Sequence, residues 1–139
     1  MIQTTVAMYS HIFVGVTDFE RALAFYSALF NVLGFEQRFC ERDKPWAGWH
    51  SEGGQRPLFV IARPHDGAPH EAGNGQMAAF SAGSRQQVDE VYRLALSLGA
   101  KDEGAPGLRP HYHADYYGAY FRDLDGNKLC VVCNEPEET

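Results

Sequence analysis

The chain has 139 residues, 45% of them hydrophobic and 22% charged, which is typical of a globular protein with one domain or two small modules that share a core. Its formal net charge of −6 argues against a nucleic-acid partner, because phosphate binding needs a clustered basic face and the 12 lysines and arginines are scattered. No apolar run approaches the roughly 20 residues that span a bilayer, so no membrane partner is expected. Three cysteines, and a start without the pattern of a secretory signal, predict reduced thiols and a cytoplasmic location.

The first half of the chain combines a strand pattern with an amphipathic helix. Apolar residues alternate with other side chains over residues 8–16 (MYSHIFVGV), and His11 belongs to the set opposite the apolar one. Thr17 and Glu20 form the pattern of a helix-capping box, and apolar residues then recur at helical spacing. These patterns predict a strand, a helix near 18–33 that begins after a Thr17 cap, and then three short strands.

The second half repeats this order. Residues 76–83 have the pattern of a short apolar strand, and Ser84 with Gln87 repeats the capping box in front of a helix near 84–98. Further strand-like pieces follow, and the last two are joined by an Asp-Gly turn. Residues 64–75, rich in glycine and proline, are predicted to be the linker between the halves.

The repeat predicts an α+β protein of two βαβββ modules, at about residues 5–64 and 75–134. One helix and four strands are too little to bury a core alone, so the two modules are expected to share one. We expect their sheets to form a concave, barrel-like surface with the helices outside. A concave surface is the default place for a ligand, and the strand set that carries His11 would face it.

Two segments carry a resemblance to a known family. HIFVGVTDFERALAFYSALFNVLGF (11–35) and GAPGLRPHYHADYYGAYFRDLDGNKLCVVC (104–133) resemble the vicinal oxygen chelate superfamily, which includes glyoxalase I, extradiol dioxygenases and bleomycin resistance proteins. The resemblance implies the two-module fold, a homodimer, and a small oxygenated molecule as substrate or ligand. In its enzymes the resemblance further implies a divalent metal ion that holds two neighbouring oxygens of the substrate.

The expected metal ligands are mostly replaced. His11 stands where the superfamily's first ligand stands, whereas Cys130 stands where its glutamate is expected. Met77 replaces a common histidine, and the strand at 58–62 offers no ligating side chain. We therefore expect no tightly bound cofactor, with His11 as the one candidate metal ligand. The alternative is a divalent ion such as zinc, nickel, iron or manganese.

Several side chains are candidates for the chemistry of the site. His11 and His113 are candidate acid–base residues. The predicted substrate contacts are Trp46, Met77, Arg109, Tyr117 and Cys130. For these residues the competing interpretation is ordinary packing or solvent exposure, and for Cys130 it is a small buried hydrophobe. His65 and His70 lie in the linker and are expected to be exposed.

Three functions remain open at this stage. The first is a metal-dependent enzyme, either a glyoxalase-like lyase or isomerase or a dioxygenase-like oxidoreductase. The second is a metal-free protein that binds or sequesters a small molecule, as bleomycin resistance proteins do. The third is a metal-free enzyme that uses a histidine for acid–base work. The missing ligands favour the second and third.

Overall fold

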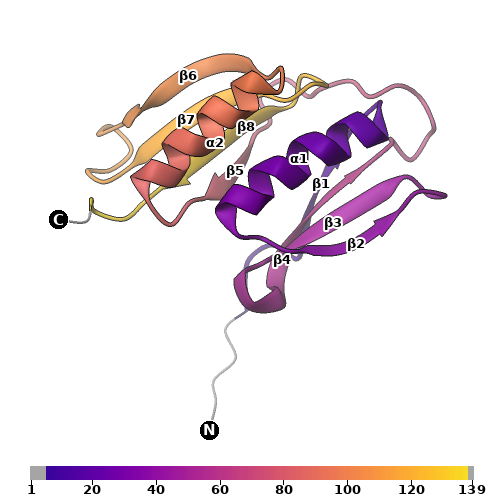
Figure 1. The fold of residues 1–139 in the computed structure, drawn as a ribbon, viewed down its shortest axis with the longest axis horizontal. Helices are drawn as coiled ribbons and strands as arrows, with labels where there is room; N and C mark the ends of the chain where they lie inside the picture. The colour runs from indigo at the N-terminus through magenta and orange to yellow at the C-terminus, as the bar shows by residue number, and fades with distance from the viewer. Residues whose placement is uncertain (1–5, 138–139) are drawn as a thin grey trace, which may run out of the picture.

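The computed structural model describes residues 6–137 as two four-stranded sheets, each with one long helix (Figure 1). The first module contains β1 (His11–Gly15), α1 (Phe19–Leu33), β2 (Gln37–Glu41), β3 (Trp46–Ser51), a single 3-10 turn (Glu52–Gly54) and β4 (Gln55–Ala62). The second contains β5 (Ala78–Ser81), α2 (Arg85–Ser97), β6 (Lys101–Leu108), β7 (Tyr117–Arg122) and β8 (Lys128–Cys133). The predicted α+β class and the two βαβββ modules are confirmed, although residue 5, the expected start of the first module, lies outside the described residues.

The two sheets have the same topology. Their strand orders are β1-β4-β3-β2 and β5-β8-β7-β6, with the first strand of each module parallel to the last and the other pairs antiparallel. The sheets do not close into a barrel within the chain, so β1 and β5 are both edge strands. The side of each sheet that its helix leaves uncovered is called here the open face.

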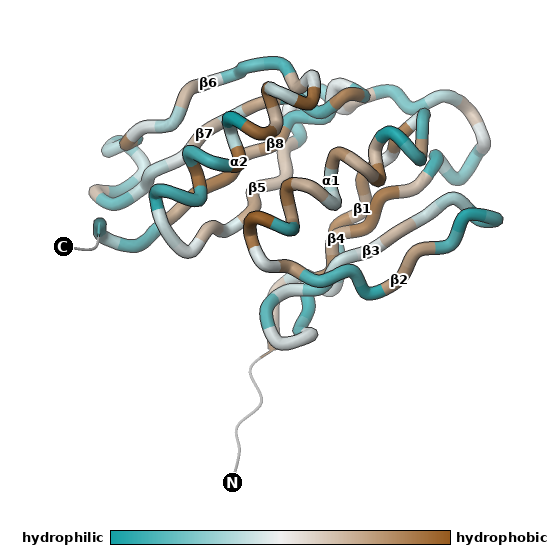
Figure 2. Tube along the Cα trace, in the orientation of Figure 1, coloured by the Kyte–Doolittle hydropathy of each residue, from teal (hydrophilic) through white to brown (hydrophobic). Residues whose placement is uncertain are grey.

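The modules share one core, as expected. Helices α1 and α2 pack side by side across the middle of the molecule (Figure 1). The ring of Phe80 on β5 lies 5.0 Å from the rings of both Phe30 on α1 and Phe59 on β4. Figure 2 shows hydrophobic residues concentrated along β1, β4 and β8, whereas β6 is mostly hydrophilic. Within residues 6–137, no helix is both long enough and apolar enough to cross a membrane.

The start of α1 differs from the prediction. The N-cap is Asp18, whose Oδ1 accepts the backbone N–H of Arg21 at 3.1 Å, and not Thr17. Thr17 instead joins other parts of the chain: its N–H donates to Asp125 Oδ1 at 2.9 Å and its hydroxyl accepts from the N–H of His70 at 3.1 Å. Threonine and aspartate are both good N-cap residues, but the hydrogen bonds of Thr17 to Asp125 and His70 leave Asp18 to cap the helix.

The start of α2 follows the prediction. Ser84 is the N-cap, and its hydroxyl accepts the N–H of Gln87 at 3.2 Å. The side chain of Gln87 reaches back and accepts the N–H of Gly83 at 2.8 Å, one residue before the cap. The capping-box pattern therefore identified a real helix start.

The turn between β7 and β8, residues 123–127, is held by a buried carboxylate and is called here the clamp turn. Asp123 is only 6% exposed and is the buried charged residue of the described chain. Its carboxylate accepts hydrogen bonds from the Tyr26 hydroxyl, from Asn127 Nδ2 (2.9 Å) and from the backbone N–H groups of Asp125 and Asn127 (both 2.9 Å). Buried charges persist when they are hydrogen-bonded in this way.

The clamp turn belongs to the second module but forms hydrogen bonds with residues of the first. Tyr26 is a fully buried residue of α1, and its burial and the neighbouring Asp123 raise its pKa, so its hydroxyl stays protonated and donates. Asn127 Nδ2 also donates to the carbonyl of Gly15, at the end of β1, at 3.0 Å. The guanidinium of Arg21 donates to the Leu124 carbonyl at 3.3 Å. These contacts fix the position of one module against the other.

Replacing Tyr26 with phenylalanine should therefore destabilise the whole protein. The change removes one donor from a buried carboxylate, and hydrogen bonds to charged groups are each worth roughly 1.5–3 kcal/mol. We expect the free energy of unfolding, measured by urea denaturation, to fall by about that amount. Tyr92→Phe is the matched control, because the Tyr92 hydroxyl also donates to a carboxylate, that of Asp102 at 2.9 Å, but at the surface. A Tyr26→Phe loss no larger than that of the control would contradict the clamp.

Candidate functional site

Strand alternation determines which side chains occupy the open faces. On β1, Ile12 and Val14 pack against the core, whereas His11 and Phe13 point to the opposite side and are exposed. On β8, Leu129 and Val131 belong to the core beneath α2, which places Lys128 and Cys130 on the open face of the second sheet. The faces of β1 and β8 thus agree with the parity expected from the sequence.

Two tyrosines cover Cys130 on the open face of the second sheet. Tyr120 is directly opposite Cys130 in the pairing of β7 with β8. The Tyr116 hydroxyl lies 2.8 Å from the Tyr120 hydroxyl and 3.5 Å from Cys130 Sγ. Cys130 itself has no exposed surface, so a molecule on this face would meet the tyrosines and not the predicted contact, the thiol.

The three groups in this cluster stay neutral at ordinary pH. Burial is the main cause that raises the pKa of Tyr116, and its hydrogen bonds to Cys130 and Tyr120 raise it further. Burial likewise raises the pKa of Tyr120 and of the Cys130 thiol above their usual values. A protonated hydroxyl is a hydrogen-bond donor, and a protonated thiol is a poor nucleophile and a poor metal ligand.

Two cations flank the ring of Tyr120. The Arg109 guanidinium carbon lies 5.4 Å from the ring centroid and Lys128 Nζ lies 5.7 Å from it, both within cation–π range. Arg109 is oriented by the carbonyls of Gly107 and Ala105, to each of which it donates at 2.9 Å. Neither cation forms an ion pair with a carboxylate among residues 6–137. Arg109, Tyr116, Tyr120 and Lys128, with Cys130 beneath them, are called here the tyrosine–cation face.

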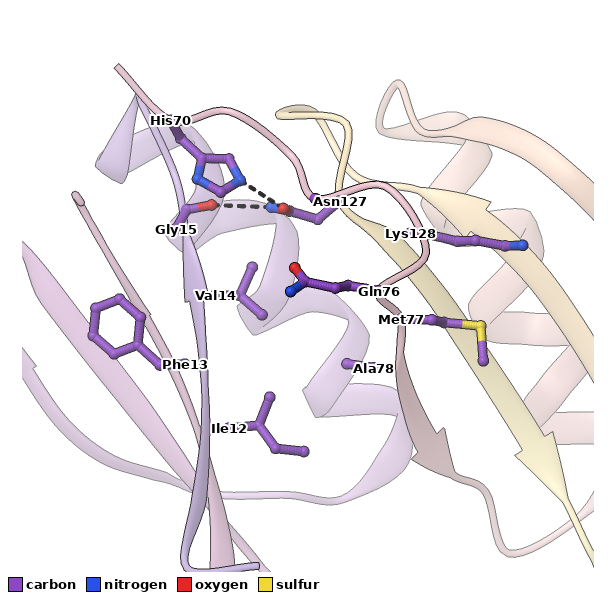
Figure 3. Close-up of a pocket in the computed structure, with 11 residues that line it drawn as sticks. Ile12, Phe13, Val14, Gly15, His70, Gln76, Met77, Ala78, Asn127 and Lys128 are labelled. Carbon is purple, nitrogen blue, oxygen red and sulfur yellow. Dashed lines mark hydrogen bonds between the residues drawn. The ribbon is translucent and has the colours of Figure 1, made fainter. Parts of the chain in front are cut away.

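A cavity of about 250 Å³ lies beside this face, between the edge strands β1 and β5 (Figure 3). It is lined by Ile12, Phe13, Val14, Gly15, His70, Gly73, Gln76, Met77, Ala78, Asn127 and Lys128. Its walls therefore come from both modules and from the linker. Because Lys128 belongs to this lining and also to the tyrosine–cation face, the two regions adjoin.

His70 lies in this cavity, although the sequence suggested an exposed linker residue. It is half-buried, and its Nε2 lies 2.7 Å from Asn127 Oδ1, a contact drawn as a dashed line in Figure 3. Its ring rests on Gly15, where a Cβ atom would come within 2.3 Å of His70 Nδ1. Gly15 occupies an open-face position of β1, and the lack of a side chain there was the signal that a distant residue could occupy the space. His65, the other linker histidine, is exposed as expected.

Two predicted residues of the first module lie apart from the cavity lining. His11 is exposed on the open face of β1, with Nδ1 3.0 Å from the Ser10 hydroxyl. Trp46 is on β3, and its ring lies 4.5 Å from that of Phe39. The structure therefore does not gather His11 and Trp46 with Arg109, Met77 and Cys130 into one cluster within the chain.

Two predicted residues of the second module are engaged elsewhere. Tyr117 points toward α2 and donates its hydroxyl to Asp89 at 2.7 Å, so it is not on the open face. Strand alternation allows only one of the adjacent pair Tyr116 and Tyr117 to face outward. His113 has partners at both ring nitrogens: Nδ1 accepts the N–H of Asp115 at 3.2 Å, and Nε2 lies 2.8 Å from Oδ1 of Asn134, the residue after β8. Neither nitrogen is free to act as a base.

The side chains at the implied metal positions do not fit a divalent ion. In the part of the chain that the structure describes, no three His, Cys, Asp or Glu side chains form a group that could hold a metal. Cys130 is buried and protonated, Met77 offers only a thioether, and His11 lies on the other module. Catalytic metal sites ordinarily use three protein ligands, and hard cations require oxygen ligands.

Comparisons with known proteins agree with this fold. The chain matches the family model of the glyoxalase/bleomycin resistance protein/dioxygenase superfamily over residues 9–131. A glyoxalase/bleomycin resistance protein from Albidiferax ferrireducens T118 is 35% identical, with a TM-score of 0.79 over 93% of this chain and 100% of that one. A lactoylglutathione lyase from Agrobacterium tumefaciens shares the fold at 21% identity, with a TM-score of 0.62 over 94% of this chain and 96% of that one. A search of curated proteins gave no match. The chain belongs to the glyoxalase/bleomycin resistance protein/dioxygenase superfamily.

Proposed function

We propose that this protein binds a small oxygenated carboxylate on its tyrosine–cation face, without a metal ion. The observation that carries the proposal is a pair of cations, Arg109 and Lys128, which both lie within cation–π range of the Tyr120 ring and form no ion pair in the described chain. The protein as a whole carries a net charge of −6, so two positive side chains near one aromatic ring, neither of them in an ion pair within the described chain, mark a preferred place for an anion.

The chemistry of the neighbouring groups supports an oxygenated ligand. Arginine and lysine both bind carboxylates, and arginine can do so with two parallel hydrogen bonds. The protonated hydroxyls of Tyr116 and Tyr120 lie 2.8 Å apart, so one donates to the other and the proton of the second can be donated to a ligand oxygen. The Tyr120 ring adds an aromatic surface against which a flat molecule can stack.

The same groups favour binding over acid–base catalysis. A general base must be deprotonated near neutral pH, but the raised pKa values keep Tyr116, Tyr120 and Cys130 protonated. Both ring nitrogens of His113 are engaged, with the N–H of Asp115 and the side chain of Asn134. A role in sequestering a small molecule also agrees with the similarity to a protein named for both glyoxalase and bleomycin resistance.

We further propose that the protein is a cytoplasmic homodimer. Large apolar side chains are unusually exposed for a monomer: Phe13 is 52% exposed, Met77 45%, Leu108 48% and Tyr112 59%. Phe13 lies on an open face that the chain's own helices leave uncovered, and a second copy would cover it. The three cysteines are free thiols, which suits a reducing compartment.

Benzoate tests the anion site, because it combines a carboxylate with a flat ring. Charged hydrogen bonds contribute roughly 1.5–3 kcal/mol each, so we expect Arg109→Ala or Lys128→Ala to weaken benzoate binding about 10- to 100-fold in a calorimetric or NMR titration. Arg93→Ala removes the same charge from an exposed position on α2 and should change the affinity less than twofold. Binding that is absent from the wild type, or equal in all variants, would contradict the site.

Metal analysis tests the proposal that no ion is needed. We expect wild-type protein, purified without an affinity tag and dialysed mildly, to contain far less than one equivalent of any divalent metal, because His11 is the sole intact ligand. His11→Ala should give the same result. Near-stoichiometric metal in the wild type that is lost in His11→Ala would show that the ion is part of the site.

The assembly can be measured by sedimentation or light scattering. We expect a mass of twice 15.5 kDa at micromolar concentrations. Phe13→Lys should shift the protein toward the monomer, because it would place a charge in the covered apolar face. A wild type that remains a monomer across this concentration range would refute the dimer.

A further inference from the structure

The side chain of Arg109, one of the two cations of the proposed anion site, lies over two glycines of the edge strand β6. Its Nη1 and Nη2 donate to the carbonyls of Gly107 and Ala105, each at 2.9 Å. A Cβ atom at Gly107 would come within 3.1 Å of Arg109 Nη1, and a Cβ atom at Gly104 within 3.3 Å of Nη2. The guanidinium therefore occupies space that a side chain at either glycine position would take.

The pairing of β6 with β7 explains why the guanidinium can lie there. Gly104 is paired with Tyr120 and Gly107 with Gly118, so both glycines of β6 belong to the open face of the second sheet. The register shifts between Gly104 and Gly107, and Ala105 is skipped in this pairing. A strand irregularity of this kind interrupts the ladder of backbone hydrogen bonds, which leaves the Ala105 carbonyl able to accept from the guanidinium.

Tyr116 is placed in a similar way at the other end of the same loop. The backbone N–H of Arg109 donates to the Tyr116 carbonyl at 2.8 Å, which closes the loop of residues 109–116. A Cβ atom at Gly118 would come within 3.0 Å of Tyr116 Cε1, so the tyrosine ring lies over this glycine. The arginine and the tyrosine that close the loop thus both lie back over glycine positions, where they approach Tyr120.

An arginine that is held in this way is prepared to bind an anion. The carbonyls of Gly107 and Ala105 use one N–H of each terminal nitrogen, and the remaining N–H groups of the guanidinium stay available for a ligand. Ordering a flexible side chain costs free energy at the moment of binding, and a side chain that is already ordered avoids much of that cost.

Building on the proposed function, we propose that Gly107 is a positioning residue of the anion site: its missing side chain lets the Arg109 guanidinium rest against β6, in place to receive a carboxylate. The backbone of Gly107 is not in the left-handed conformation that alanine resists. Among the described residues beyond its neighbours in sequence, Arg109 Nη1 is the atom that its Cβ would meet within 4 Å. Gly107→Ala therefore moves the guanidinium while the strand is kept.

A titration of Gly107→Ala with benzoate tests the proposal. We expect the affinity to fall about 2- to 10-fold, which is the cost of ordering one long side chain on binding. In an Arg109→Ala background the same change should leave the affinity unaltered, because the side chain through which Gly107 acts is gone. Gly83→Ala is the matched control, since Gly83 is likewise not left-handed and its Cβ would meet only the side-chain oxygen of Gln87, at 3.4 Å. This control should bind benzoate as the wild type does.

NMR of the guanidinium tests the same contact without a ligand. In the wild type, the Nη signals of Arg109 should be resolved and should exchange slowly with water, because two carbonyls hold these groups. Gly107→Ala should broaden or remove the signals, and Gly83→Ala should keep them. Freely rotating Nη groups in the wild type, or signals unchanged in Gly107→Ala, would overturn the role of Gly107.

The outcomes separate this inference from the function on which it rests. Benzoate binding that depends on Arg109 but is unaffected by Gly107→Ala would overturn the role of Gly107 alone. Equal weakening by Gly107→Ala with and without Arg109 would do the same, since the glycine would then act through the fold. Absence of benzoate binding to the wild type would overturn the proposed function, and the NMR comparison would still decide whether Gly107 places Arg109.

Discussion

The buried carboxylate of Asp123 is the interaction on which the arrangement of the two modules depends. It accepts the Tyr26 hydroxyl from the first module and holds Asn127, which in turn binds the end of β1 and the ring of His70. An ion buried to this degree is costly unless its hydrogen bonds are complete, and the first module supplies one of the four donors, the Tyr26 hydroxyl. The Asp-Gly turn thus reverses the chain and also couples the folding of the second module to its contact with the first.

The same clamp lies next to groups to which we assign ligand binding. Asn127 holds the ring of His70 in place, and Lys128, the next residue, begins the strand that carries Cys130. The superfamily fold is retained, but the side chains at the implied metal positions are a neutral thiol, a thioether and one exposed imidazole. Positive side chains and neutral hydroxyl donors lie close to those positions. An anion can be held by such groups directly, with charge-assisted hydrogen bonds in place of a metal ion.

Periodicity and capping patterns were sufficient to predict the fold, because both modules bury one face of each element. The predicted helix near 84–98 and its Ser84 cap are found almost unchanged. Local patterns could not decide between Thr17 and Asp18, since the choice rests on contacts with Asp125 and His70, which are distant in sequence. They also could not place a linker histidine over Gly15, or tell which of Tyr116 and Tyr117 faces outward. Side-chain positions that depend on how the modules meet need the three-dimensional structure.

We propose that this member of the superfamily binds its ligand through charged and neutral protein groups, without a metal ion. It is tested most directly by a crystal structure of the protein grown with benzoate and manganese chloride together. We expect the carboxylate at Arg109 or Lys128 on the tyrosine–cation face, and no manganese between His11 and the ligand. A manganese ion bound by His11 and chelated by the oxygens of the ligand would contradict it.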